Sequence, residues 1–460
     1  MWIHGGSTLP ADDEGRILDR LAGLEKVIPA ELVRQVLQAT GRVNGRACEL
    51  THEVMLWVVL AMGLLTHLPI RQVFRHARRM RLGGKCPARS SLCVARQRLG
   101  AAPVQELHRA AVHVLATPGT PGAFYGGLRL IGIDGVVLDA PDSAANASFG
   151  RAAGGRGAGA FPQVRKASLV ELGTHVELAL AIGGWHDDER VLARQLWNQV
   201  PSDALLLADQ GFLSYKDWQT LHARCKLLFR VRQAFVFKTV QRLPDGSYLT
   251  KIYPDGRDRQ NDRRGILVRM IEYTLDDPQR TGHGERHRLI TSLLDPDQAP
   301  ALELIVLYHE RWEEELVFDE QKTHQDPRRP GKPAQLRSET PDGVRQELFA
   351  LSLGHFVVRA LMFQAARPLE LDTDRLSFVH CFRVLQCRLP ECDSRTASSL
   401  DAWYQTLLEE IRSEAIGPRR NRINPRVIKR KMSKWPKARA HHRKPTPLLK
   451  TFTQTIVMQT

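Results

Sequence analysis

Four side chains that could act together on a phosphodiester recur at helical spacing within residues 308–324, YHERWEEELVFDEQKTH. Tyr308, Arg311, Glu315 and Lys322 fall at offsets of zero, three, seven and fourteen. A helix turns by about 100° per residue, so the four positions lie within roughly 60° of one another. The spacing therefore predicts a helix face with one aromatic ring, two cations and one carboxylate, suited to gripping a phosphodiester beside an acid. An ordinary solvated charged helix is the simpler alternative for a run this polar.

The spacing of these four residues resembles the signature of the insertion sequence 4 family of bacterial DDE transposases. Two further stretches resemble that family's acidic motifs, IGIDGVVLDAPDSAANASFG at 131–150 and LLLADQGFLSYKDW at 205–218. Three blocks in order are more specific than any one of them, and with its flanks the resemblance covers most of the chain. Val136 stands where threonine or serine is common, and Gln210 where arginine is frequent. Neither change removes a carboxylate, so both bear on the level of activity more than on identity.

The resemblance implies that Asp134, Asp209 and Glu315 are the catalytic carboxylates and the ligands of Mg²⁺, for which Mn²⁺ could substitute. Cleavage of a phosphodiester needs in-line attack at phosphorus while charge builds on the leaving oxygen. Two cations roughly 3.5 to 4 Å apart can activate the attacking oxygen and stabilise the leaving one, and hard cations prefer carboxylate oxygens. Clustered acids repel one another, which makes a purely structural trio the weaker explanation.

Other acids near these motifs compete for the same role. Asp139 and Asp142 follow Asp134 closely, but a turn or capping role suits them better. The run 186–189, HDDE, precedes an amphipathic segment, and acids at a helix start are favoured by the helix dipole in any case. Glu189 remains a minor candidate for assisting the metal site.

The glycine-rich run GRAAGGRGAGAF at 150–161 invites comparison with a nucleotide-binding loop. It lacks the third glycine of GxGxxG and leads to Phe161 and Pro162 instead of a helix, so a flexible connection is the better interpretation. No GxSxG, P-loop or HExxH occurs, which leaves esterase, nucleotide hydrolase and zinc protease functions without a starting residue. The seven cysteines form no CxxC pair, which indicates reduced thiols.

The net charge of +16 is concentrated in two zones. After Glu414 there are thirteen Lys and Arg and no acid, which leaves +3 for the residues before. Between Glu53 and Glu106 there are nine Lys and Arg, within 71–98, again without an acid. Such zones favour DNA binding. For the zone after Glu414, a solvated tail is the alternative. We expect DNA contacts from Arg75, Arg78, Arg79, Arg426, Lys429 and Arg430, in addition to Tyr308, Arg311 and Lys322.

The sequence predicts an α/β fold with a ribonuclease H-like mixed sheet. Apolar strands are expected at 128–140, 167–172, 175–184, 203–209 and 226–232, with helices before and after the fourth. Asp134 then lies within the first strand and Asp209 at the exposed end of the fourth, beside it. His175, in a strand, is interpreted as a packing residue. Expected segments are a helical DNA-binding domain at 1–120, the core at 121–232, a β-rich insertion at 233–300, the rest of the core with the catalytic helix at 301–370, and a helical, basic end at 371–460.

The sequence does not predict a membrane-spanning helix in the apolar run 54–70. The apolar run 54–70 is short, contains His67 and ends near a proline, so a buried helix is expected. The start of the chain lacks the order of a signal peptide, and a bacterial cytoplasmic protein associated with the nucleoid is expected.

The favoured function is a transposase that cuts the ends of its own element and joins them to target DNA. The resemblance implies cut-and-paste movement within a synaptic homodimer, with a hairpin at the flank as one route. A transposase-derived DNA-binding protein without activity has no physical need for three clustered carboxylates beside a polyanion. A ribonuclease H-like nuclease acting on branched DNA would need neither the two basic zones nor the long insertion.

Overall fold

The computed structural model describes residues 19–44, 48–77, 86–154, 157–278, 283–309, 313–327, 336–392, 396–416 and 450–459. The chain divides into two compact units, and each is described by itself. Unit 1 holds residues 1–123, 134–199 and 313–417, and unit 2 holds residues 124–133, 200–312 and 418–460.

Unit 1 begins with the predicted helices. They are η2 (Asp19–Lys26), α1 (Ala30–Ala39), α2 (His52–Leu64), α3 (Ile70–Ala77), α4 (Arg89–Leu99) and α5 (Ala102–Ala111). Thr51 caps α2, because its side chain accepts a hydrogen bond from the amide of Val54 at 3.1 Å. Every residue of α2 from Val54 to Leu64 is buried, which confirms the expectation of a buried helix for this apolar run.

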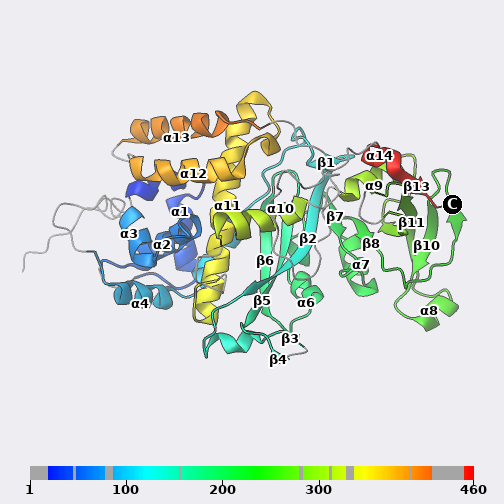
Figure 1. The fold of residues 1–460 in the computed structure, drawn as a ribbon, viewed down its shortest axis with the longest axis horizontal. Helices are drawn as coiled ribbons and strands as arrows, with labels where there is room; N and C mark the ends of the chain where they lie inside the picture. The colour runs from blue at the N-terminus through cyan, green and yellow to red at the C-terminus, as the bar shows by residue number, and fades with distance from the viewer. Residues whose placement is uncertain are drawn as a thin grey trace, which may run out of the picture. The chain divides into compact units, whose positions relative to one another are not determined.

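The long helix α11 (Pro341–Ala366) forms the core of unit 1. It packs against α2, α5, α12 (Phe378–Arg388) and α13 (Ala397–Arg412), as Figure 1 shows. Gly63 permits the close crossing of α2 and α11, because a methyl group there would overlap the carbonyl of Ala350. Residues Pro341–Leu369 are long and apolar enough to cross a membrane, but 89% of their most apolar window is buried inside the protein.

The predicted order of strands and helices along the chain is confirmed. The fold is α/β, with a mixed sheet flanked by helices. In unit 1, β5 (Gln163–Glu171) and β6 (Val176–Gly184) pair antiparallel, and β5 lies next to β2 (Leu128–Asp139) in the sheet. Helix α6 (Glu189–Arg194) follows. In unit 2, the first half of β2 pairs parallel with β7 (Ala204–Ala208), and β7 pairs parallel with β8 (Lys226–Arg230). Helix α7 (Tyr215–His222) connects these last two strands.

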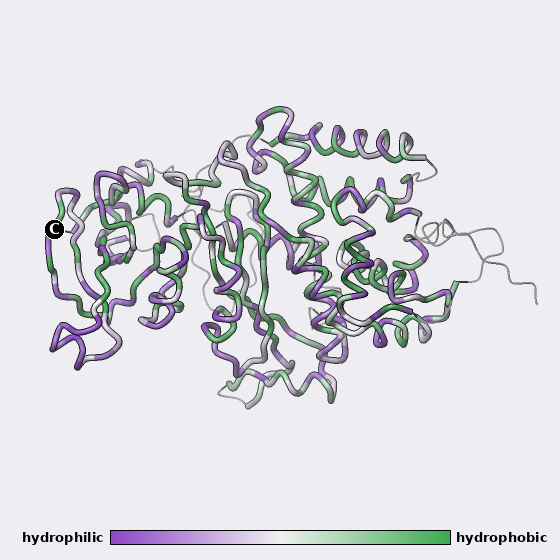
Figure 2. The backbone as a smooth tube through the Cα atoms, turned by 180° about the vertical axis from the view of Figure 1, so that it is seen from behind, coloured by the Kyte–Doolittle hydropathy of each residue, from purple (hydrophilic) through white to green (hydrophobic). Residues whose placement is uncertain are grey.

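The β-rich insertion continues the sheet of unit 2. Its elements are β9 (Gln241–Arg242), β10 (Tyr248–Ile252), α8 (Gly256–Gln260), β11 (Ile266–Leu275) and β12 (His287–Thr291), followed by α9 (Ala301–His309). Strand β12 pairs antiparallel with β8 and with β11, so no separate sheet forms. Figure 2 shows hydrophobic stretches along the strands, whereas the segment around α8 is hydrophilic.

The end of the chain returns to this sheet, which the sequence analysis did not foresee. Helix α14 (Phe452–Thr455) leads into β13 (Ile456–Met458), and β13 pairs antiparallel with β11. The basic end is therefore followed by an ordered anchor.

The glycine-rich run is also more regular than the expected flexible connection. Strands β3 (Ala153–Gly154) and β4 (Gly157–Ala158) form a small antiparallel hairpin. Arg151 holds its base, donating hydrogen bonds to the carbonyls of Gly159 and Ala160. This hairpin does not lead into the N-terminus of a helix, so the nucleotide-loop alternative has no structural basis here.

Candidate active site

Asp134 lies in the middle of β2, as predicted. The strand around it is buried because its residues Leu130–Ile133 are apolar or glycine and sit inside the sheet. The carboxylate accepts a hydrogen bond from the amide of Gly135 at 2.8 Å. A side chain on Gly135 would overlap the carboxylate of Glu189, the first residue of α6. Unit 1 therefore places a second carboxylate against the backbone next to Asp134.

Asp209 is the residue that directly follows β7. All five residues of β7 are buried, and its last residue, Ala208, is paired in register with Ile133 of β2. Within unit 2, Asp209 therefore directly follows a fully buried and paired strand. The Oδ1 atom of Asp209 is buried and has no hydrogen-bond partner among the described residues. A buried anionic oxygen without a partner costs free energy, because it has lost its hydration. A bound cation would remove that cost, so the position is suited to a metal ion.

Tyr308 lies on α9 in unit 2, and its side chain is 8% exposed. Its hydroxyl donates a hydrogen bond to the carbonyl of Ala208 at 3.2 Å. The tyrosine therefore holds the end of β7 just before Asp209, instead of standing on an open helix face as the spacing argument assumed.

Glu315 lies on α10 (Glu313–Asp319) in unit 1 and is half-buried. Three consecutive neighbours, Leu316, Val317 and Phe318, are buried and hold the helix in the core. Arg311, the other cation of the predicted stripe, lies outside the described residues.

The single straight helix assumed for the stripe does not extend to Lys322. From Glu320 the helix continues as the π-helix η6 (Glu320–Gln325), whose hydrogen bonds span one residue more than those of an α-helix. The wider turn changes the direction of each following side chain, so the ideal spacing fails beyond Asp319. Lys322 is half-buried and lines a small pocket of unit 1 together with Val136 and Leu138 of β2. It thus lies close to the strand that carries Asp134.

The competing acids are engaged elsewhere. Asp142 forms an ion pair with Arg151 at the base of the small hairpin, and Asp139 accepts a hydrogen bond from Gln163 at 3.2 Å. Asp188 caps α6 by accepting from the amide of Arg190 at 2.8 Å. The contact of Asp188 is the capping role expected at a helix start, whereas Asp139 and Asp142 contact side chains of other segments instead of forming the expected turn or cap.

The described residues contain no preformed cage of carboxylates. Within the part of the chain that the structure describes, no three His, Cys, Asp or Glu side chains are close enough to hold a metal ion. Asp134 and Glu315 belong to unit 1, whereas Asp209 belongs to unit 2.

The first basic zone is divided between surface and core. Arg75 on α3 is exposed, as a DNA contact requires. Arg96 on α4 is half-buried, and its guanidinium donates to Gln346, Ser338 and the carbonyl of Gly343 at 2.7 to 3.0 Å. Arg96 therefore connects α4 to α11, and its guanidinium is not available for binding DNA. Five further predicted DNA contacts lie outside the described residues: Arg78, Arg79, Arg426, Lys429 and Arg430.

A buried ionic network behind Glu315 was missed by the sequence analysis. His175, interpreted as packing, is fully buried with a left-handed backbone and hydrogen bonds with Arg359 of α11. Burial alone would raise the pKa of Glu320, but the Arg359 guanidinium and the hydrogen bonds of His175 and His355 hold that pKa well below its usual range. The one sequence signal was a charged residue next to a glutamine, Glu320–Gln321, separated from the apolar run Leu316–Phe318 by Asp319 alone.

A second part of this network surrounds Glu177 of β6. Burial alone would raise the pKa of Glu177, but the ammonium of Lys166 and hydrogen bonds from Lys166 and Ser168 outweigh it and lower the pKa to about 2. Glu177 is therefore ionised and paired inside unit 1.

Comparison with known proteins gives consistent matches. The insertion element 4 transposase N-terminal model matches residues 18–109, and the transposase DDE domain model matches residues 125–353. The chain is 28% identical over 428 residues to the transposase InsG for insertion sequence element IS4 of Escherichia coli strain K12, covering 91% of this chain and 94% of that protein. It is 28% identical over 201 residues to the putative transposase InsZ of the same strain, covering 41% of this chain and 62% of that protein.

Among solved structures, a piggyBac transposase synaptic complex with hairpin DNA is similar over 88% of this chain and 87% of that chain, at 13% identity and a TM-score of 0.43. Asp134, Asp209 and Glu315 all fall inside the range matched by the DDE domain model.

Proposed function

Because this chain belongs to the insertion sequence 4 family of DDE transposases, we propose that it binds the terminal inverted repeats of its own element, cleaves the DNA there and joins the freed 3′ hydroxyl ends to target DNA. Membership alone establishes a DNA-cleaving transposase that depends on divalent metal. The inverted repeats, the identity of the metal and the residues that act are parts of the proposal.

Asp134, Asp209 and Glu315 are proposed as the metal ligands, with Mg²⁺ as the metal. The observation that carries this assignment is the buried Oδ1 of Asp209, which has no partner among the described residues although it directly follows a fully buried strand. A carboxylate oxygen there fits a hard cation, which prefers oxygen ligands. When bound, the metal would supply charge stabilisation for the attacking and leaving oxygens of the phosphodiester.

The cationic residues of the catalytic segment are proposed to hold the DNA. Lys322 lies beside β2 and can reach a phosphate near Asp134, and Arg311 is assigned the neighbouring phosphate from its spacing. Tyr308 is proposed to fix the end of β7, because its hydroxyl binds the backbone directly before Asp209. Its contribution is then to geometry more than to direct DNA contact.

The two basic zones are proposed to divide recognition between them. Residues 71–98 are assigned the reading of the element end, because the exposed Arg75 lies on helix α3, which packs in unit 1 and fixes the position of this side chain. The run after Glu414 carries prolines and no acid and is assigned non-specific affinity. Cut-and-paste movement within a homodimer, with a hairpin intermediate at the flank, completes the proposal.

A cleavage experiment tests the assignment. The substrate is linear duplex DNA that carries the element end taken from the sequence flanking the gene, incubated with the purified full chain and Mg²⁺. We expect alanine at Asp134, Asp209 or Glu315 to abolish cleavage while binding of the same duplex stays within about twofold, because the basic contacts remain. Asp142→Ala is the matched control, since that acid is engaged with Arg151. A triad variant that still cuts in Mg²⁺ would remove that residue from the site.

A further inference from the structure

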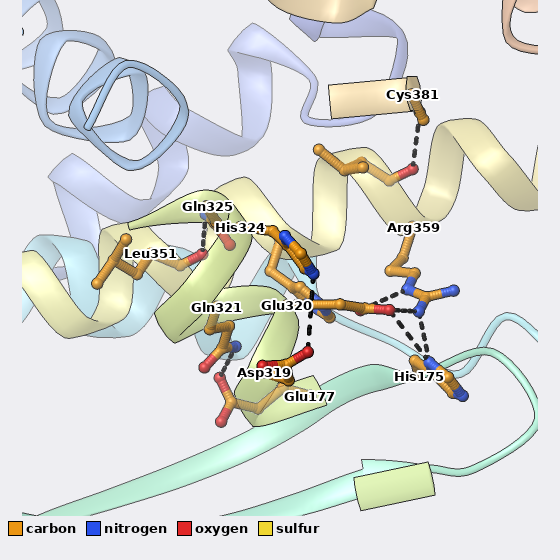
Figure 3. A network of polar contacts seen from close by, with 12 residues as sticks. His175, Glu177, Asp319, Glu320, Gln321, His324, Gln325, Leu351, Arg359 and Cys381 are labelled. Carbon is orange, nitrogen blue, oxygen red and sulfur yellow. Dashed lines mark hydrogen bonds and ion pairs between the residues drawn. The ribbon is translucent and has the colours of Figure 1, made fainter. Parts of the chain in front are cut away.

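We propose that Glu320 and Gln321 are positioning residues that fix the rotation of the helix presenting Glu315. The inference rests on the proposed function, because it takes Glu315 as a metal ligand. Its basis is the attachment of η6, directly after α10, to three other elements of unit 1 (Figure 3). The three residues that make these attachments, Glu320, Gln321 and Gln325, are called the η6 anchors below.

Glu320 attaches the helix to α11. Its carboxylate accepts a hydrogen bond from His355 at 2.9 Å and from Nε of Arg359 at 3.1 Å, and it pairs with a second guanidinium nitrogen of Arg359. Glu320 is 6% exposed and both partners are almost fully buried. Because both charges are removed from water, a displaced Glu320 would leave an unpaired buried charge on each side.

Gln321 attaches the helix to the β5–β6 hairpin. Its amide nitrogen donates to Glu177 at 2.9 Å, and its amide oxygen accepts from the ammonium of Lys166 at 2.6 Å. Lys166 also pairs with Glu177 at 2.7 Å. The glutamine therefore completes a buried pair on the strands, with both ends of its side chain used.

Gln325 attaches the last turn to the crossing of α2 and α11. Its amide nitrogen donates to the carbonyls of Gly63 and Leu351, each at 2.8 Å. Gly354 leaves room for this side chain, since a methyl group there would come within 2.9 Å of the Gln325 nitrogen. The anchor thus fits only where the two helices cross at glycines.

Glu320 and Gln321 are consecutive residues that reach separate partners. Side chains of neighbouring residues in an α-helix diverge by about 100°, and at the start of the wider η6 turn Glu320 and Gln321 likewise face different elements, α11 and the β5–β6 hairpin. Two directed contacts at different angles around one axis fix its rotation, whereas the apolar contacts of Leu316–Phe318 tolerate small slips. The polar network therefore specifies one orientation.

The orientation of this helix determines where the carboxylate of Glu315 lies. Glu315 stands five residues before Glu320 in the same helical run. Side chains extend about 5 to 6 Å from a helix axis, so a rotation of about 10° moves the carboxylate by about 1 Å. Metal sites need ligands placed within about 0.5 Å, so a slip of this size would weaken binding of the cation.

The test compares two buried glutamines in unit 1. Gln321→Met removes the polar contacts of one η6 anchor but leaves Lys166 and Glu177 paired with each other. Gln346→Met is the matched control, because Gln346 is also buried and forms three hydrogen bonds, but with Arg96 and Gly100 and not with the Glu315 helix. Binding of Mn²⁺ to the full chain is measured by electron paramagnetic resonance, beside the thermal midpoint and the Mg²⁺ dependence of end cleavage.

We expect Gln321→Met to weaken Mn²⁺ binding by about tenfold, as the loss of supporting contacts does in metal sites, and to shift the Mg²⁺ requirement of cleavage by the same factor. Gln346→Met should lower the thermal midpoint comparably and leave Mn²⁺ affinity within about twofold. Equal Mn²⁺ affinity in the two variants would overturn the inference.

Two further variants keep the test decisive. Glu320→Gln preserves the shape of the first anchor and removes its charge, and it replaces Gln321→Met if that protein does not fold. Glu315→Ala separates the two claims, because normal Mn²⁺ binding and cleavage in Glu315→Ala would defeat the proposed site itself. Loss of both in Glu315→Ala, with no effect in either anchor variant, would defeat only the positioning role.

Discussion

The hydroxyl of Tyr308 donates a hydrogen bond to the carbonyl of Ala208 at 3.2 Å, directly before Asp209 in the chain. The spacing in the sequence placed Tyr308 with Arg311 and Glu315. Its hydroxyl instead binds the backbone next to another acid, Asp209. Within unit 2, helix α9 and strand β7 are joined at the point where the strand ends. The tyrosine is therefore a means of holding Asp209 in place.

Tyr308→Phe should remove this hold and little else. We expect a loss of about 1 kcal/mol in stability and about a tenfold fall in the cleavage rate, because a small displacement of a catalytic group is costly. Tyr248→Phe is the control, since its hydroxyl also forms a hydrogen bond in unit 2, with Glu272 at 3.0 Å. The single-turnover cleavage rate at saturating DNA distinguishes the two variants, and an equal loss in both would contradict a specific role for Tyr308.

Gly135→Ala should displace the carboxylate of Glu189 from beside Asp134. A flexible side chain can move away, so we expect under about 1 kcal/mol loss of stability, whereas the cleavage rate should fall about tenfold. Glu189→Ala should have a similar effect, and the double variant should be no slower than the slower single one, because both changes remove the same contact. Additive losses in the cycle would show that Glu189 is not the cause.

His108 should make the stability of unit 1 depend on pH. It is buried beside Ser352, at 2.8 Å from its hydroxyl, and burial lowers the pKa of His108 to about 4. An unfolded histidine takes up a proton near pH 6.5, so the stabilisation is complete above that pH and is lost as the pH falls toward about 4, by about 3 kcal/mol in all.

The thermal midpoints of the wild type and of His108→Gln measure this effect. We expect the thermal midpoint of the wild type to fall further than that of His108→Gln when the pH is lowered from about 7 to about 5. Parallel changes in both proteins would assign the acid sensitivity to other groups.

The basic run after Glu414 should contribute affinity without discrimination. Each neutralised phosphate adds about 0.9 to the slope of affinity against salt in a logarithmic plot, so replacing Arg426, Lys429 and Arg430 by Gln should flatten that slope by up to about 2.7 for element ends and random DNA alike. The substitutions leave β13 intact, which a deletion to the end of the chain would not.

Arg75→Gln on α3 is the comparison, and it should reduce the preference for element ends instead. Loss of discrimination in the triple variant, at an unchanged salt slope, would make the run after Glu414 the sequence reader.

The sheet could be predicted from the sequence because its strands carry their own signals. The apolar runs of β7, β2 and β6 are local, and the strand order followed from them. The turn at Gly246, which has a left-handed φ of 83°, was equally visible in the sequence PDG.

Features that depend on distant partners were not visible. Residues of the π-helix after Asp319 form buried hydrogen bonds with α11, with the β5–β6 hairpin and with α2 at its crossing with α11. No local sequence pattern predicts these contacts. Arg96 looked like part of a basic face, but Gln346, 250 positions away, accepts a hydrogen bond from its guanidinium and holds it against α11. The short strand β13 follows a long polar run, and its pairing with β11 is equally remote in sequence.

The most direct test of the central claim, that Asp209 binds the catalytic metal, is a change of metal preference. Asp209→Cys replaces a hard oxygen ligand by a soft sulfur, which binds Mg²⁺ poorly and Mn²⁺ better. The cleavage rate of the element end by Asp209→Cys is measured in Mg²⁺ and in Mn²⁺, beside that of the wild type. The account predicts a loss of at least about a hundredfold in Mg²⁺ and a recovery of at least about tenfold in Mn²⁺ that the wild type does not share. Cleavage by Asp209→Cys that stays near the wild-type rate in Mg²⁺ would contradict it.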